Sequence, residues 1–183
     1  MGTLKKNVFL VGFMGVGKTT VARRLARNLR VTAIDVDSYL QRRYGLDASE
    51  LFEHHGEEGL RALEADALRD CAAMGPAIIS CGEGVVALEE NRKLLASQGL
   101  TVLLESSAEE SLERIRSLRT RPLLARGCNA DDLWNQRKPY YDEVAHATVD
   151  VAQMSTAAAV DRLESILVEQ GAYIPEEQDK PTE

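Results

Sequence analysis

The chain has 183 residues, of which 44% are hydrophobic and 28% are charged, and this balance is typical of one globular domain with a hydrophobic core. Its formal net charge of −7 argues against a broad surface for nucleic acid or for an anionic membrane, because both carry negative charge. The three cysteines have no metal-type or redox-type spacing, which is typical of a reducing cytoplasm. We therefore expect a cytoplasmic protein with neither nucleic acid nor a membrane as partner, and we also expect a monomer.

Short apolar runs rich in Val, Ile and Leu alternate with helical patterns along the chain. The runs that we expect to be strands are residues 7–12, 31–35, 76–80, 100–105 and 147–151. Helical patterns cover residues 19–29, 57–71, 86–98, 107–115, 131–144 and 156–170. Continuous apolar runs are typical of strands buried on both faces. The alternation therefore predicts an α/β fold, a three-layer sandwich around a mainly parallel, five-stranded sheet.

The domain organisation predicted from these patterns is simple, since the sequence shows neither an internal repeat nor a linker. Residues 1–172 form a single expected domain, and residues 173–183 form a polar tail that we expect to be disordered. Residues 118–131 interrupt the alternation, because they are basic, contain a proline and follow neither the helical nor the strand period. A loop of that length in a compact domain predicts a small lid.

Residues 12–19 read GFMGVGKT, which matches the phosphate-loop pattern G-x-x-x-x-G-K-S/T. An expected strand precedes the loop and an expected helix follows it, so main-chain N–H groups and the helix N-terminus can bind phosphates. We expect Lys18 to reach the β- and γ-phosphates of ATP and Thr19 to ligate Mg²⁺. The residues predicted to bind the nucleotide through this loop are Gly12, Gly15, Val16, Gly17, Lys18, Thr19 and Thr20.

Kinases, GTPases and motor ATPases all use a phosphate loop, so other features must separate them. The guanine-reading pattern N-K-x-D is absent, and no long apolar run ends in an acidic residue, as it would in a motor ATPase. The chain is also too small to couple hydrolysis to a large movement. We therefore predict an ATP-dependent kinase that phosphorylates an alcohol group of a small molecule.

Several further motifs resemble those of the shikimate kinase family, which has the nucleoside-monophosphate-kinase-like fold. They are FLVGFMGVGKTT at 9–20, DVD at 35–37, GEEGLRALE at 56–64, CGEG at 81–84, RPLL at 121–124 and RKPYYDEVA at 137–145. The resemblance extends from about residue 7 to residue 150. It implies ATP and Mg²⁺ as cofactors and an acceptor that bears a carboxylate.

By this resemblance, two aspartates and two basic residues serve the reaction. Asp35 is implied to hold Mg²⁺ through water, and Asp37 to bind the acceptor hydroxyl and take its proton. The two aspartates are two residues apart at an expected strand end, so we expect them to point the same way. Arg121 is implied to reach the transferring phosphoryl group from the lid, which makes Lys18, Asp37 and Arg121 the predicted catalytic set.

Three further arginines match family positions. Arg61 and Arg137 match arginines that bind the substrate carboxylate, a role that suits planar guanidinium groups, and Glu64 supports that site. Arg114 matches a residue that packs on adenine. We expect Trp134 and the neighbouring Tyr140 and Tyr141 to pack in the core and at a hinge rather than to contact a ligand.

The chain departs from the family at residues 81–84, where the family normally has three consecutive glycines after a threonine or similar residue. Here Glu83 stands between Gly82 and Gly84, and all three are predicted to border the substrate pocket. The stretch from Leu124 to Arg137 also looks a few residues shorter than in the family. A buried carboxylate beside the substrate carboxylate would repel it unless the carboxylate is paired.

Two arrangements avoid this repulsion. In the first, Glu83 turns to solvent or onto Arg61 or Arg137, and the substrate is shikimate, which becomes shikimate 3-phosphate. In the second, Glu83 binds the ammonium group of a hydroxy amino acid such as L-homoserine, whose carboxylate the two arginines hold. We take the second as the main hypothesis and the first as the alternative. A nucleotide-binding module without catalysis is a third possibility, against which the intact Lys18 and Arg121 argue.

Overall fold

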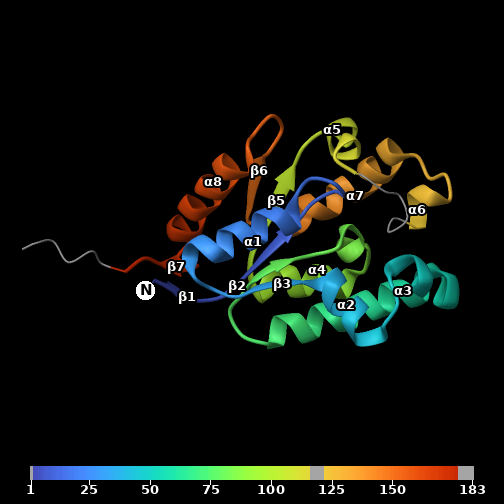
Figure 1. The fold of residues 1–183 in the computed structure, drawn as a ribbon, viewed down its shortest axis with the longest axis horizontal. Helices are drawn as coiled ribbons and strands as arrows, with labels where there is room; N and C mark the ends of the chain where they lie inside the picture. The colour runs from blue at the N-terminus through green and yellow to red at the C-terminus, as the bar shows by residue number, and fades with distance from the viewer. Residues whose placement is uncertain (1, 116–121, 177–183) are drawn as a thin grey trace, which may run out of the picture.

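Five strands form the central sheet of the computed structural model, which describes residues 2–115 and 122–176 (Figure 1). The strands lie in the order β3–β4–β2–β5–β6, and every neighbouring pair is parallel. Their bounds are β2 (Asn7–Val11), β3 (Ala33–Asp35), β4 (Ile78–Ser80), β5 (Gly99–Glu105) and β6 (Ala147–Asp150). The structure thus confirms the predicted α/β fold with a parallel five-stranded sheet.

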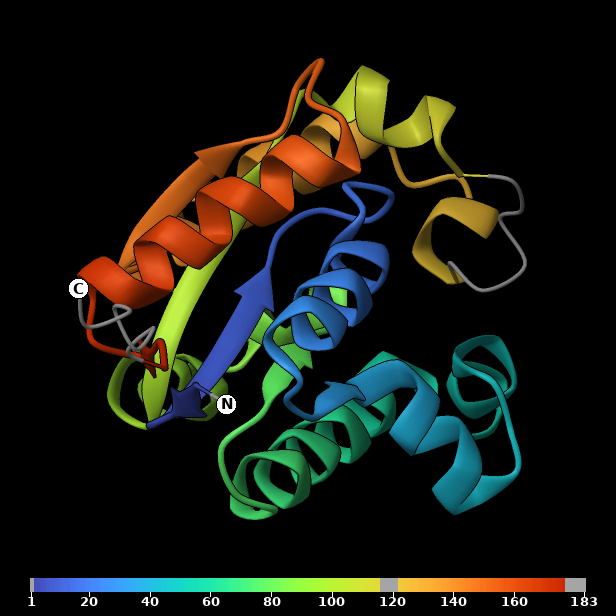
Figure 2. The same ribbon diagram turned by 60° about the vertical axis from the view of Figure 1, so that its left-hand side comes forward.

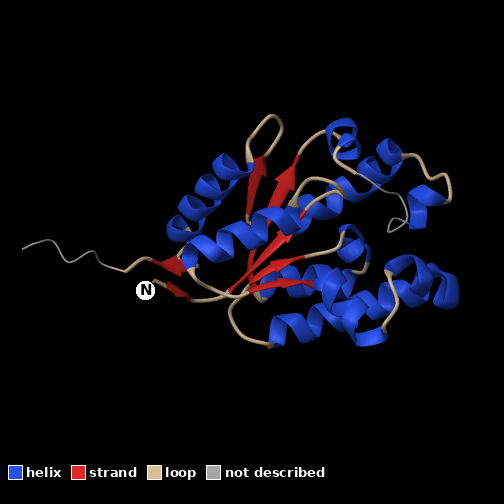
Figure 3. Cartoon of the chain, in the orientation of Figure 1, coloured by secondary structure: helices blue, strands red, loops and turns tan. Residues whose placement is uncertain are grey.

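Helices cover both faces of this sheet (Figures 2 and 3). They are α1 (Lys18–Leu29), α2 (Val36–Tyr44), α3 (Ala48–Ala73), α4 (Glu89–Ser97), α5 (Ala108–Glu113), α6 (Pro122–Ala125), α7 (Ala130–Val144), α8 (Thr156–Glu169) and the 3₁₀ helix η1 (Glu83–Ala87). None of the helices within the described residues has both the length and the apolar character needed to cross a membrane.

The two faces of β2 show why the sheet needs both helical layers. Val8 and Leu10 point into a core shared with α1 and α8, which lie together on one face. Phe9 and Val11 point into a second core, formed with α2, α3, α4 and α7. All four side chains are fully buried, because alternate residues of a strand face opposite sides of the sheet. This alternation produces the three-layer sandwich.

The last described strand returns to the first in a small second sheet. The strand β1 (Thr3–Leu4) pairs antiparallel with β7 (Tyr173–Ile174), and Lys5 N donates to Ala172 O over 2.8 Å. Tyr173 and Ile174 therefore belong to the fold rather than to the predicted tail. Residues 177–183 of that tail lie outside the described residues.

Helix formation extends beyond the predicted segments at several places, and α2 lies wholly outside them. The helix α3 starts at a capping box made by Asp47 and Glu50, and Gly56, with φ 68° and ψ −176°, divides it from the helix predicted at 57–71. Part of the predicted lid is also helical, since α6 lies within it and α7 begins at Ala130. Residues 118–121 lie outside the described residues, so a closing motion of the lid stays a prediction.

Candidate active site

The phosphate loop connects β2 to α1 at the carboxyl end of the sheet, where parallel α/β sheets bind ligands. Gly12 and Gly15 have φ angles of 143° and 80°, and a Cβ atom on Gly15 would overlap the Ser111 carbonyl, so only glycine fits there. The buried Lys18 donates from Nζ to the carbonyl oxygens of Gly12 (2.7 Å) and Phe13 (2.9 Å). The lysine ammonium therefore lies against the loop that is expected to hold the phosphates.

A cleft of about 200 Å³ runs beside this loop. One wall is formed by the phosphate loop, including Lys18, Thr19 and Thr20, and the other contains Asp37 and residues 81–83. The phosphate loop thus shares one cleft with Asp37, Gly82 and Glu83 of the predicted acceptor site, although these residues come from distant parts of the sequence.

Thr19, Asp35 and Ser80 form a polar cluster next to the cleft. Thr19 Oγ1 donates to Asp35 Oδ2 over 2.7 Å and lies 3.2 Å from Ser80 Oγ. Burial raises the pKa of Asp35, but hydrogen bonds from Thr19 and Ser38 outweigh burial and hold that pKa below its usual value. An ionised carboxylate beside a hydroxyl fits Mg²⁺, which is usually bound by one or two carboxylates together with substrate phosphates. The described residues hold no group of three or more His, Cys, Asp or Glu that could bind a metal unaided.

Asp37 reaches the cleft by a different route from the one predicted. The strand β3 ends at Asp35, whose side chain accepts a hydrogen bond from Ser38 N (2.9 Å) and caps α2. Asp37 therefore lies in the first turn of a helix, and the strand alternation that we used to place it was wrong. In this position a Cβ atom on Gly82 would lie 2.6 Å from Asp37 Oδ1, so the glycine makes room for the aspartate.

Arg61 on α3 and Arg137 on α7 are both buried, and Arg61 lines a smaller pocket that shares Asp37, Gly82 and Glu83 with the cleft. Arg61 Nη1 donates to Glu64 Oε2 over 2.7 Å, and its Nη2 lies 3.7 Å from Glu57 Oε1. Burial lowers the pKa of Arg61, but the nearby carboxylates outweigh burial and hold that pKa above its usual value. A Cβ atom on Gly84 would overlap Arg61 Nη1, so this second glycine makes room for the arginine.

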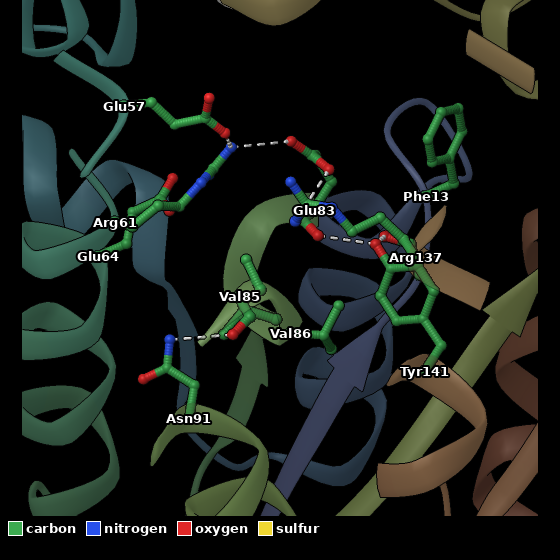
Figure 4. Close-up of polar contacts among 12 residues, drawn as sticks. Phe13, Glu57, Arg61, Glu64, Glu83, Val85, Val86, Asn91, Arg137 and Tyr141 are labelled. Atoms are coloured by element: carbon green, nitrogen blue, oxygen red, sulfur yellow. Dashed lines mark hydrogen bonds and ion pairs between the residues drawn. The ribbon is translucent and has the colours of Figure 1, made fainter. Parts of the chain in front are cut away.

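Glu83 points toward both arginines (Figure 4). Its Oε1 lies 3.7 Å from Arg61 Nη2 and its Oε2 lies 3.9 Å from Arg137 Nη1. The side chain is 13% exposed, so the arrangement in which Glu83 turns to solvent is not the one observed. The two flanking glycines admit Asp37 and Arg61, and of these three consecutive residues Glu83 is the one whose side chain faces both arginines.

Glu64 is the carboxylate most changed by its surroundings. Burial raises the pKa of Glu64 to about 7, although the ion pair with Arg61 opposes the change. The nearby carboxylates of Asp37 and Glu83 contribute to this increase. The carboxyl groups of Glu64, Asp37 and Glu83 are therefore close enough together to influence one another.

The predicted adenine residue lies on the opposite side of the phosphate loop. Arg114 follows α5, and its Nη1 donates to Val16 O over 3.5 Å. Together with Gly17, Arg114 lines a second cavity, of about 330 Å³. The far wall of that cavity, which includes Val151 and Ser155, was missed by the sequence analysis. It follows β6, and the rule that ligands bind at carboxyl ends of parallel strands could have found it.

Tyr141 connects the phosphate loop to residues 81–84, a role that sequence reasoning also missed. Its hydroxyl lies 2.7 Å from the Glu83 carbonyl oxygen and 3.2 Å from that of Gly12. Tyr141 and Trp134 pack in the core as predicted, with ring centroids 6.0 Å apart. Tyr140 is 36% exposed and its ring lies under Arg92, so it lies outside the core, and a place at a hinge stays a prediction. Arg121 lies outside the described residues, and its catalytic role stays a prediction.

The comparisons with known proteins agree with one another. A family model described as shikimate kinase matches residues 14–167. Shikimate kinase of Chromobacterium violaceum is 37% identical over 182 residues, which cover 98% of each chain. That of Bordetella pertussis is 41% identical over 159 residues, which cover 85% of this chain and 75% of the relative. The structure of Acinetobacter baumannii shikimate kinase in complex with shikimate has a TM-score of 0.85 and 31% identity, covering 90% of this chain and 94% of that one.

These relatives overturn the hypothesis that the acceptor is a hydroxy amino acid such as L-homoserine. Each of the three is a shikimate kinase, which favours the alternative reading of the substrate. The geometry removes the reason for the hypothesis, because Arg61 and Arg137 already face the Glu83 carboxylate. An ammonium group on the substrate is therefore not needed to balance its charge.

Proposed function

Because the chain belongs to the shikimate kinase family, we propose that it transfers the γ-phosphate of ATP to the 3-hydroxyl of shikimate. The family makes the chain a kinase with a hydroxyl acceptor. One observation carries the choice of acceptor. Two arginines, Arg61 and Arg137, are buried near the cleft that Lys18 and Asp37 line. Shikimate has one carboxylate for the arginines and three hydroxyls, one of which can face Asp37.

The nucleotide side of the cleft supports ATP as the phosphate donor. The phosphate loop offers main-chain N–H groups and the start of α1 to the phosphates, and Lys18 adds a positive charge. Thr19 and Asp35 would hold Mg²⁺, which neutralises phosphate charge when it is bound. Arg114 and the residues after β6 leave a cavity beside the loop that suits the adenine base.

Positioning is the main task of the protein in this reaction, because phosphoryl transfer depends on an in-line nucleophile more than on a strong base. We assign Arg61 and Arg137 to the substrate carboxylate and Asp37 to the acceptor hydroxyl, whose proton it takes. The arginines at the carboxylate and Asp37 at the hydroxyl would together fix the orientation of the shikimate ring. Arg121, by the family resemblance, would stabilise the phosphoryl group during transfer.

We place this activity in the cytoplasm, since all three cysteines are free thiols. One chain carries the residues of both the nucleotide site and the acceptor site, so a monomer suffices for catalysis. The intact set of Lys18, Thr19, Asp35 and Asp37 argues against a nucleotide-binding module that lacks catalysis.

The proposal is tested by ADP release in the presence of Mg²⁺ and ATP. We expect ADP release to depend on added shikimate and to be strongly reduced with shikimate methyl ester, which keeps the hydroxyls but has no carboxylate charge. The variant Lys18→Ala gives the background of the assay. ADP release that does not respond to shikimate would contradict the proposed acceptor, and equal use of the ester would contradict the role of the arginines.

A further inference from the structure

The ion pairs around Glu83 are incomplete. The distances of 3.7 Å to Arg61 and 3.9 Å to Arg137 are too long for hydrogen bonds. As a result, Glu83 Oε2, Arg61 Nε and Arg137 Nη1 are buried without a hydrogen-bond partner among the described residues. Buried charged groups usually satisfy their hydrogen bonds, so this arrangement needs an explanation.

The two unpartnered arginine atoms are donors, and a substrate carboxylate could accept from both. The unpartnered oxygen of Glu83 is an acceptor and would repel the same carboxylate. A pocket of about 30 Å³ lies on the Arg61 side of Glu83, lined by Arg61, Glu64 and Glu83 among others. Because the Glu83 carboxylate faces both guanidinium groups, it stands where a substrate carboxylate held by both arginines would lie.

We propose that Glu83 is an intramolecular competitor, whose carboxylate takes the place of the substrate carboxylate between Arg61 and Arg137 in the free protein and leaves when substrate binds. This inference rests on the proposed function, since it assumes a substrate that bears a carboxylate. It makes Glu83 a determinant of substrate affinity and not a catalytic residue.

The loop geometry allows the side chain to move without a change of the backbone. The Glu83 carbonyl oxygen accepts a hydrogen bond from the buried Tyr141 hydroxyl (2.7 Å), which fixes the main chain. The flanking Gly82 and Gly84 have no side chains that would block rotation, and Glu83 also lines the larger cleft of about 200 Å³. Rotation of the side chain alone would free both guanidinium groups.

Competition of this kind raises the KM for the substrate. Charge-assisted hydrogen bonds of good geometry correspond to about ten- to a hundredfold in binding. Because the observed distances are long, we expect the lower end, so removal of the Glu83 charge should lower the KM for shikimate about tenfold. The change should fall on KM rather than on kcat, because Glu83 contacts neither the hydroxyl nor the phosphates in this account.

The test compares two isosteric variants. Glu83→Gln removes the charge between the arginines. Glu57→Gln is the matched control, since Glu57 lies at the same 3.7 Å from Arg61 Nη2 but is 52% exposed. We expect the KM for shikimate to fall about tenfold in Glu83→Gln and to change less than about twofold in Glu57→Gln. An unchanged or higher KM in Glu83→Gln would overturn the inference and make Glu83 a structural support of the arginines.

A binding measurement separates this inference from the proposed function. The probe is 1-cyclohexenecarboxylate, which keeps the ring and the carboxylate of shikimate but has no hydroxyl to phosphorylate. Calorimetry should show about tenfold tighter binding to Glu83→Gln than to the wild type. If this result holds while the wild type fails to phosphorylate shikimate, the proposed function is wrong and the inference stands. If shikimate is phosphorylated but the probe binds both proteins equally, only the inference fails.

A second variant covers the case in which Glu83→Gln does not fold. Glu83→Gly restores the three consecutive glycines that are usual in the family, and it should shift the KM and the probe affinity in the same direction. Weaker probe binding by a folded Glu83→Gly protein would contradict the competitor role as well.

Discussion

The variant Tyr141→Phe removes one hydroxyl that connects the substrate loop to the core. The phenol is fully buried in α7, and burial raises its pKa well above the usual value, so the hydroxyl keeps its proton. One proton can be donated to one acceptor at a time, and the Glu83 carbonyl at 2.7 Å is nearer than that of Gly12 at 3.2 Å. Phenylalanine keeps the ring packing and leaves the Glu83 carbonyl without this donor.

The expected loss of stability follows from this geometry. A net hydrogen bond is worth about 1 kcal/mol, and a buried acceptor left without a donor costs about 1–3 kcal/mol. The space left by the missing hydroxyl is small and admits little repacking, so we expect the free energy of unfolding to fall by about 1–2 kcal/mol. For a chain of this size that loss lowers Tm by about 2–8 °C.

Urea denaturation measures this loss, and Tyr140→Phe provides the matched control. Tyr140 is the neighbouring residue and is partly exposed, and its hydroxyl makes no hydrogen bond that the described structure contains. We expect Tyr140→Phe to change the free energy of unfolding by less than about 0.5 kcal/mol, as is usual for surface substitutions. A loss in Tyr141→Phe no larger than that in Tyr140→Phe, at equal denaturant dependence, would refute the argument that the hydroxyl anchors the loop.

Three further predictions concern the reaction and its pH dependence. Lys18→Ala and Arg121→Ala should each lower kcat by orders of magnitude in a coupled ADP assay, because both act on charge that develops during transfer, and normal turnover in either would exclude that role. Asp35→Asn should raise the Mg²⁺ concentration for half-maximal activity about tenfold or more, and a magnesium titration that matches the wild type would remove Asp35 from the metal site. The pKa of Glu64 lies near 7 in the folded chain, against 4.5 as its ordinary value. The native protein therefore binds a proton that the unfolded chain has lost, so the Glu64 contribution to stability falls as pH rises from about 4.5 to 7, by at most about 3 kcal/mol. Glu64→Gln should lack this slope in denaturation series across that range, and an unaltered slope would show that another group causes it.

The sheet and the nucleotide loop could be predicted because their signals are local. A run such as residues 7–12 is apolar throughout since both faces of β2 are buried, and the phosphate loop depends on backbone positions that only glycine can adopt. These features follow from neighbouring residues alone, so sequence patterns were sufficient.

The acceptor site depends on contacts between segments that are distant in the sequence, and two predictions about it were wrong. Asp37 was placed at a strand end because the helix α2, which Asp35 caps, has no strong apolar period and was not predicted. The direction of Glu83 is set by Arg61 on α3 and Arg137 on α7, which no local pattern reveals. Without knowledge of that pairing, the extra carboxylate suggested a substrate that bears an ammonium group, and the choice of acceptor was wrong.

The central claim is that the chain phosphorylates shikimate, and identification of the product tests it most directly. Wild-type protein, Mg²⁺, ATP and shikimate would be incubated together, and both products would be quantified by mass spectrometry. The account predicts shikimate that carries one added phosphoryl group, in an amount equal to the ADP formed. ADP without phosphorylated shikimate would show that water is the acceptor, and that result would contradict the account.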